Sequence, residues 1–308
     1  MFHNHELIAE DNIDLQNLYK SRAQDCINIL RAHGLLDGVQ GTINKKILVN
    51  NWQHAGSIHI SLFYLDSIGL LSNGQAQNNL GLILQKANRL DEICWPLKYL
   101  SEDTDIFKNP EKAQSNFILL IDNASMYLRI CIQRLAKVGL LSGKHAQKNY
   151  HNLIQILQPK PLDECANGLN IKKTIENFLD LKLLKGPNAQ RNFNIITKFP
   201  CNAIAISEIF IKLNTANLLS NESGNANIQK IIAYRDFADE ILLRMPALPL
   251  TQEKLDAIFV CIDGRLAAEK EAFLLSQASI EFFVKGKRAD VKNLYKEINS
   301  YNPSVRRK

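Results

Sequence analysis

The chain has 308 residues, of which 46% are hydrophobic, so it can bury a large core and does not have the composition of a disordered chain. Its formal net charge is +6, but residues 285–308 carry eight basic and two acidic side chains, which leaves 29 residues of each sign in the body. A neutral body argues against a nucleic-acid groove along the fold, because such a groove needs a basic face.

Compartment and redox state can be judged from what the sequence lacks. No apolar run approaches the roughly 18 residues that read as a membrane span, and residues 1–10 lack the apolar core of a signal peptide. None of the six cysteines lies within four residues of another, so the spacings of zinc ribbons and redox motifs are absent. We therefore expect all six (Cys26, Cys94, Cys131, Cys165, Cys201 and Cys261) to be reduced and buried.

The first half of the chain shows helical periodicity between short junctions. Apolar residues at three- and four-residue spacing predict a first long helix or helix pair at 6–33. Pro96 should kink its helix or start a new one. The further predicted helices cover 43–49, 54–68, 75–87, 90–100, 112–123 and 125–138.

The second half begins with the longest interval between helices, which contains Pro159 and Pro161. The helices predicted after it cover 163–181, 203–216 and 228–245. A final hairpin of 251–261 and 265–284 has a strongly apolar second helix, as expected of an element that seals the open end of a stack. A short helix at 289–299 and a loose tail complete the expected elements.

Several junctions repeat one pattern, Leu-Leu followed by Ala-Gln-x-Asn and a large apolar residue. Clear copies lie at 69–80, 139–150 and 182–193, and weaker ones begin near 35, 106, 218 and 248. The second apolar residue of the pair falls at 36, 71, 107, 141, 184, 219 and 250, in steps of 35, 36, 34, 43, 35 and 31. A period near 35 is that of a two-helix unit, which predicts an all-α, right-handed solenoid of about six to seven degenerate helix-turn-helix repeats.

The chemistry of this pattern is that of a helix junction. Gly69 and Gly139 can take the left-handed conformation that ends a helix, and Ser72 and Ser142 are suited to cap the next one. The asparagine recurs at 44, 79, 116, 149, 192 and 227. We expect it to bond to the backbone of the adjacent unit's turn; a ladder of side chains facing a ligand is the alternative.

A regular repeat removes the need for a domain break, since each unit packs only on its neighbours. The prediction is a single solenoid over 1–308. It has N-terminal helices at 1–33, repeats at 34–263, and capping helices with a basic tail at 264–308.

No motif in the chain points to catalysis. There is no Gly-rich phosphate loop, no Gly-x-Ser-x-Gly elbow and no His-Glu-x-x-His sequence, so we predict no catalytic residue, cofactor or metal. Trp95 and Tyr99 share a helix face and are either core residues or a partner-facing anchor. Insertions in repeat proteins often lie on the binding face, which draws attention to 151–168. The partner-binding candidates are Trp95, Tyr99, His151, Lys160, Asp163 and Glu164.

The Leu-Leu-Ser-x-x-x-Ala-Gln-x-Asn pattern at 70–79, with Leu250-Thr251-Gln252-Glu253, resembles the degenerate helical repeats of Dot/Icm-type secretion effectors of intracellular bacterial pathogens. The resemblance covers roughly 30–260 and implies no catalytic residue. It implies a protein made in the bacterial cytoplasm and delivered into host cytosol, with 299–308 as the candidate secretion signal. The period is also similar to that of tetratricopeptide repeats, whose Trp-Leu-Gly-Tyr signature is absent.

Three functions remain open on the sequence. The first is a non-catalytic scaffold or regulator that binds a host protein or restrains another effector. The second is an enzyme with a site grafted on the solenoid, which would show as a pocket of convergent titratable groups. The third is a lipid- or nucleic-acid-binding module in which 285–308 makes weak contact with acidic lipid or phosphates. We expect a protein partner, no nucleic acid and no membrane span.

Overall fold

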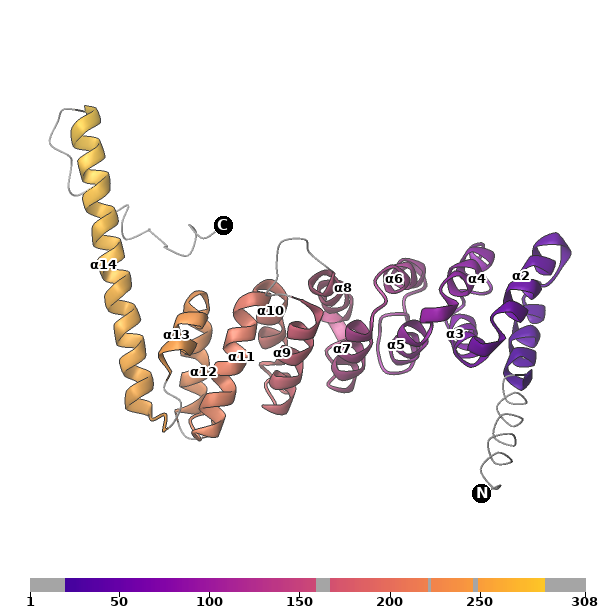
Figure 1. Cartoon of the computed structure of the whole chain (residues 1–308), viewed down its shortest axis with the longest axis horizontal. Helices are drawn as coiled ribbons and strands as arrows, with labels where there is room; N and C mark the ends of the chain where they lie inside the picture. The colour runs from indigo at the N-terminus through magenta and orange to yellow at the C-terminus, as the bar shows by residue number, and fades with distance from the viewer. Residues whose placement is uncertain (1–19, 159–166, 221–222, 246–248, 286–308) are drawn as a thin grey trace, which may run out of the picture. The chain divides into compact units, whose positions relative to one another are not determined.

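The computed structural model, drawn in Figure 1, describes residues 20–158, 167–220, 223–245 and 249–285. Within those ranges the chain is helical with short turns and contains no strand, which confirms the all-α class. The chain divides into two compact units, Met1–Pro200 and Cys201–Lys308, and each is described by itself. Whether 1–308 forms one continuous solenoid stays a prediction.

The first unit is built from pairs of short helices. In its described part residues 20–32 are helical, and the helices that follow are α2 (Gly38–Asn50), α3 (Ala55–Ser67), α4 (Ala76–Gln85), α5 (Asp91–Glu102), α6 (Pro110–Asp122), α7 (Met126–Lys137), α8 (Ala146–Leu157), α9 (Gly168–Asp180) and α10 (Ala189–Lys198). The second helices of the pairs, α3, α5, α7 and α9, contact one another in succession. The first helices α4, α6 and α8 lie along the other side of the unit (Figure 1).

The second unit contains α11 (Pro200–Thr215), α12 (Gly224–Ala233), α13 (Ala238–Arg244) and α14 (Gln252–Lys285). A 3-10 turn at Arg235–Phe237 divides the single helix predicted at 228–245. The predicted final hairpin is wrong, since α14 is one continuous helix. The reason is that Gly264, the only helix breaker there, costs about 1 kcal/mol, which is too little to interrupt a run of good helix formers such as 265–270. Likewise α5 runs through Pro96.

The junctions share one backbone geometry. The residue before each Leu-Leu pair has a left-handed φ, of 66–75° at Gly34, Gly69 and Gly139 and 58° at Lys182 and Asn217. The next residue donates its backbone N–H five residues back, as in Leu70 to Leu65, Leu140 to Leu135 and Leu218 to Leu213. This is the hydrogen bonding of a Schellman cap, so the left-handed helix end predicted at the glycines is confirmed.

The start of the next helix differs from the prediction. Ser72 is not the N-cap of α4, which begins four residues later at Ala76, and its hydroxyl lies 3.3 Å from His33 Nδ1 instead. Ser142 precedes the 3-10 turn Gly143–His145 but accepts no capping bond. Side-chain caps occur at other helices: Asn109, Ser125 and Asn167 accept backbone N–H bonds at the starts of α6, α7 and α9.

The recurring asparagines are all buried, and each one forms the same side-chain hydrogen bond. Each donates its Nδ2 at 2.7–2.9 Å to the carbonyl of the first apolar residue of its own junction. The six asparagine–carbonyl pairs are 44–35, 79–70, 116–106, 149–140, 192–183 and 227–218. The expected backbone bond is therefore present, but it closes the asparagine's own turn and not the adjacent one.

The link to the adjacent unit is made by the glutamine of the Ala-Gln-x-Asn pattern. Asn79 and Gln114 exchange two amide hydrogen bonds, of 2.9 and 2.7 Å. The pairs Asn44–Gln77 and Asn149–Gln190 do the same, and so does Asn227 with Gln252, which follows Leu250-Thr251 and lies outside that pattern. We call the asparagines and these glutamines the amide ladder. Because its groups are buried or half-buried, each bond sets the register of one helix pair on the next.

The second apolar residue of each junction contributes to the core beside this ladder. Leu36, Leu71, Phe107, Leu141, Leu184 and Leu250 are all buried, while Leu219 is half-buried. Among the cysteines, Cys26, Cys94 and Cys131 are buried free thiols, and burial raises the pKa of Cys26 to about 12. Cys201 is disulfide-bonded and Cys261 is exposed, so the expectation of six reduced, buried cysteines is wrong at those two positions. Cys165 lies outside the described residues.

Candidate functional site

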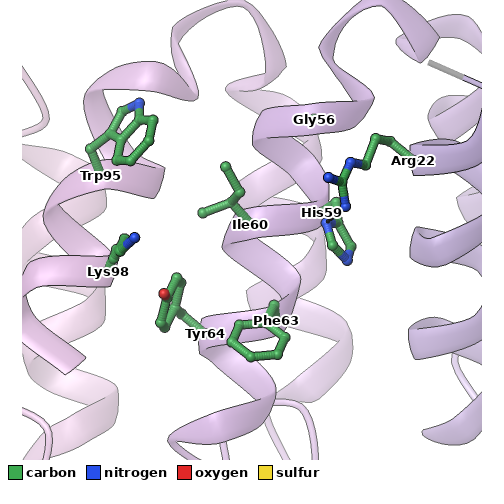
Figure 2. Close-up of a pocket in the computed structure, with 8 residues that line it drawn as sticks. All are labelled: Arg22, Gly56, His59, Ile60, Phe63, Tyr64, Trp95 and Lys98. Atoms are coloured by element: carbon green, nitrogen blue, oxygen red, sulfur yellow. Dashed lines mark hydrogen bonds between the residues drawn. The ribbon is translucent and has the colours of Figure 1, made fainter. Parts of the chain in front are cut away.

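An open pocket of about 310 Å³ lies in the first unit, between the helix at 20–32, α3 and α5 (Figure 2). Its walls are mainly apolar. The residues that line it are Arg22, Gly56, His59, Ile60, Phe63, Tyr64, Trp95 and Lys98. Its volume is at the lower end of the range for ligand sites and suits one or two inserted side chains.

The helical period places the lining residues of α3. Gly56, His59, Ile60 and Phe63 recur at i, i+3, i+4 and i+7, so they share one face. The opposite face of α3 carries Ile58, Leu62 and Leu65, which are fully buried. Phe63 keeps 53% of its surface exposed, and its ring meets the Tyr64 ring edge-on at 5.1 Å between centroids. The pocket face of α3 therefore carries apolar surface that the core does not use.

Trp95 forms the α5 wall of the pocket, and Figure 2 shows its indole across from Ile60. Two cations lie near its ring. Lys98 Nζ is 5.7 Å and Arg129 Cζ is 5.6 Å from the ring centroid, within the range of cation–π attraction. Ile93, Cys94 and Leu97 fix α5 from its buried side.

The charges around the pocket are unevenly paired. Arg22 forms an ion pair with Asp25 at 3.6 Å, and its Nη1 is 3.5 Å from His59 Nδ1. Among the residues that the structure describes, Lys98 and Arg129 have no carboxylate within 4.0 Å. The pocket is therefore nearly neutral at the Arg22 end and cationic at the Trp95 end.

The pKa values of two titratable groups in the pocket are shifted by their surroundings. Burial lowers the pKa of His59, an effect that Asp25 opposes and Arg22 reinforces. Burial also raises the pKa of Tyr64, and the bond that its hydroxyl donates to Glu102 raises it further. At neutral pH Tyr64 is therefore a neutral donor that occupies Glu102. Both pKa shifts follow from burial and from pairing with nearby side chains. The arrangement of these side chains is suited to binding a ligand.

Gly56 opens the pocket at the start of α3. A Cβ placed there would meet no atom within 4 Å, so the space above this residue is unfilled. Gly81 in α4 has the same open surroundings but does not line the pocket. The two glycines form a matched pair for tests in which a side chain is added.

Of the partner-binding candidates from the sequence, only Trp95 lines the pocket. Tyr99 is half-buried on α5 and accepts a 2.8 Å hydrogen bond from Gln133 Nε2. His151 is exposed on α8, with Nδ1 2.7 Å from the Gln147 carbonyl, and α8 contributes nothing to the pocket. Lys160, Asp163 and Glu164 lie outside the described residues, as do most of the basic residues of 285–308. The candidate roles of these residues stay predictions.

Sequence reasoning missed the residues that surround Trp95. A usable signal was the repeat period itself, because Ile60 lies 35 residues before Trp95 and Arg129 lies 34 residues after it. Inspection of the residues about one period before and after Trp95 would have found both neighbours. Lys98 carried the same signal, since it lies 35 residues after Phe63, and Arg22 carried none.

The described residues contain no group of three or more His, Cys, Asp or Glu side chains placed to hold a metal ion. None of the described helices is both long and apolar enough to cross a membrane. Comparison of the chain with protein families, curated proteins and solved structures found no match.

Proposed function

We propose that this protein is a helical-repeat scaffold that binds another protein, and that the pocket between the helix at 20–32, α3 and α5 holds side chains of that partner. The observation that carries the proposal is the pocket itself, an open apolar hollow bordered by the exposed Phe63, by Trp95 and by arginine and lysine side chains. Aromatic residues and arginine are the types that dominate the energy of protein interfaces.

Three regularities support a repeat scaffold as the frame of this site. The junctions share one left-handed residue and one cap geometry. The asparagine–carbonyl bond occurs in six successive units. In the first unit α3, α5, α7 and α9 contact one another in order. Stacked helix pairs of this kind present a continuous row of helix surfaces to a partner.

The test is capture of binding proteins by the purified full chain in three forms: wild type, Gly56→Leu and Gly81→Leu. Gly56→Leu adds a side chain at the pocket opening, where a Cβ meets no atom within 4 Å, and Gly81→Leu is the same change away from the pocket. Lysates from bacterial and animal cells, compared by quantitative mass spectrometry, cover both partners that the effector resemblance implies.

We expect a protein that is retained by wild type and Gly81→Leu and lost with Gly56→Leu. Equal retention by all three forms would remove the pocket from the interface. Capture of nothing by the folded wild type from either lysate would contradict the proposal as a whole.

A further inference from the structure

We infer that the pocket recognises an acidic peptide segment, one that inserts an apolar side chain between Ile60 and Trp95 and places a neighbouring carboxylate on Lys98 and Arg129. This inference rests on the proposed function and adds the chemistry of the partner. The observation behind it is that the pocket is nearly neutral at the Arg22 end and cationic at the Trp95 end.

The cationic end of the pocket is available to a ligand. Lys98 and Arg129 lie within 6 Å of the Trp95 ring and, in the described part of the chain, pair with no carboxylate. The neighbouring carboxylates are already engaged: Asp91 Oδ1 accepts a 2.6 Å bond from Ser57, and Glu92 pairs with Arg89. Neither forms an ion pair with Lys98 or Arg129, so among the described residues a carboxylate delivered beside Trp95 would meet two cations whose ion-pair positions are open.

The other end of the pocket defines how the segment lies. Arg22 is compensated by Asp25, and Tyr64 donates to Glu102, so neither offers an unpaired charge. The apolar group of the ligand is expected against Ile60, Tyr64 and Phe63, with its acidic group toward α5 and α7. Partial exclusion of water by the apolar walls strengthens the contact of that acidic group with the two cations.

The same charges disfavour a nucleic acid. A polyanion carries closely spaced phosphates and needs a continuous basic surface. Here Arg22 is paired with Asp25, and Glu102 is an anion beside Tyr64, so the basic surface is interrupted at that end of the pocket. The pocket therefore favours one or two negative charges next to an apolar group over a row of phosphates.

The experiment is selection of short random peptides, displayed on phage, against the folded full-length chain. We expect enriched sequences in which an aromatic or aliphatic residue has Asp or Glu within a few positions. Synthetic peptides of the enriched sequence are then measured by fluorescence anisotropy against the variants at low and at physiological salt.

The variants separate charge from shape. Lys98→Met and Arg129→Met should each weaken binding of the acidic peptide about tenfold, which corresponds to about 1.4 kcal/mol. Both should leave binding of a peptide with Gln or Asn in place of the acidic residues nearly unchanged. Lys148→Met, an exposed lysine on α8, is the control and should have no effect.

The outcomes distinguish this inference from the proposed function. Enriched peptides that are apolar but not acidic, and that lose binding with Gly56→Leu, would overturn the acidic specificity and leave the pocket as the interface. Peptides whose binding survives Gly56→Leu, or the absence of any enriched peptide, would overturn both. A single-stranded oligothymidine that binds with equal affinity and is lost with Lys98→Met would show that the surface is a phosphate site.

Discussion

Two sets of positions in the first compact unit, the amide ladder and the pocket, use the helix-pair repeat in opposite ways. The amide ladder places the same residue, asparagine, at the same position of each unit and buries it every time. The pocket is built from equivalent positions that carry different residues, as with Ile60 and Trp95 or Phe63 and Lys98, each pair 35 residues apart. Repetition of a residue marks what the fold needs, because every helix junction presents the same unpaired carbonyl. Variation at a repeated position marks where one surface is made unlike the others.

From this comparison we predict that substitutions in the amide ladder lower the stability of the protein, whereas substitutions in the pocket weaken binding of the partner. The largest effect is expected at Asn79, which is fully buried and bonded to the Leu70 carbonyl and to Gln114. Asn79→Ala leaves the Leu70 carbonyl without its side-chain donor and removes both bonds to the half-buried Gln114, so it should cost about 3 kcal/mol of unfolding free energy. Its neighbour Asn78 is exposed, and Asn78→Ala should change stability by less than about 0.5 kcal/mol. Urea denaturation of the two variants measures this difference, and equal stabilities would show that the ladder is not a structural element.

The second effect concerns the left-handed residue of the junction. Gly139 has φ of 75°, so Gly139→Ala should destabilise the protein by about 1–2 kcal/mol. Lys182 takes the same position with φ of 58°, so Lys182→Gly should stabilise it by about 1 kcal/mol. Opposite shifts of the melting temperature are the expected readout. Shifts of the same sign would mean that the two junctions are not equivalent.

A smaller effect is expected on the pocket side of the comparison. Phe63 is 53% exposed and packs edge-on against Tyr64, so Phe63→Ser should cost about 1 kcal/mol or less. The same variant should lose the partner captured by the wild type. Chemical denaturation and the capture assay, run on one preparation, test both statements. A large loss of stability would place Phe63 in the core and weaken the case for an interface.

The smallest effect is a dependence of stability on pH at His59. Burial lowers its pKa in the folded protein, so the unfolded chain takes up the proton first as the pH falls below about 6.5. Stability contributed by neutral His59 is then lost on acidification and is fully present above that pH. His59→Gln should flatten the slope of unfolding free energy between about pH 5 and 7 relative to wild type. An unchanged slope would show that other titratable groups cause the dependence of stability on pH.

The elements that sequence reasoning predicted well are those set by local rules. Leu-Leu after a glycine, followed by Ala-Gln-x-Asn, identified the junctions, the left-handed turns and the burial of the asparagines, because each depends on residues within about ten positions of one another. The predicted caps at Ser72 and Ser142 failed because an extra turn precedes the next helix. The final hairpin failed because a single glycine was given too much weight against the helix formers around it.

The sequence alone determined the all-helical class, the positions of the junctions and the residue that every junction buries. These follow from hydrophobic periodicity and from the need to pair each buried polar group. Only the tertiary structure showed that the glutamine of one helix pair bonds to the asparagine of another, and that Trp95 faces Ile60 beside two cations with no carboxylate partner in the described part of the chain. Apart from the contact of Lys98 with Trp95 and the pair Asn227–Gln252, these contacts join residues more than thirty positions apart. They depend on how the helices pack, which a local pattern does not encode.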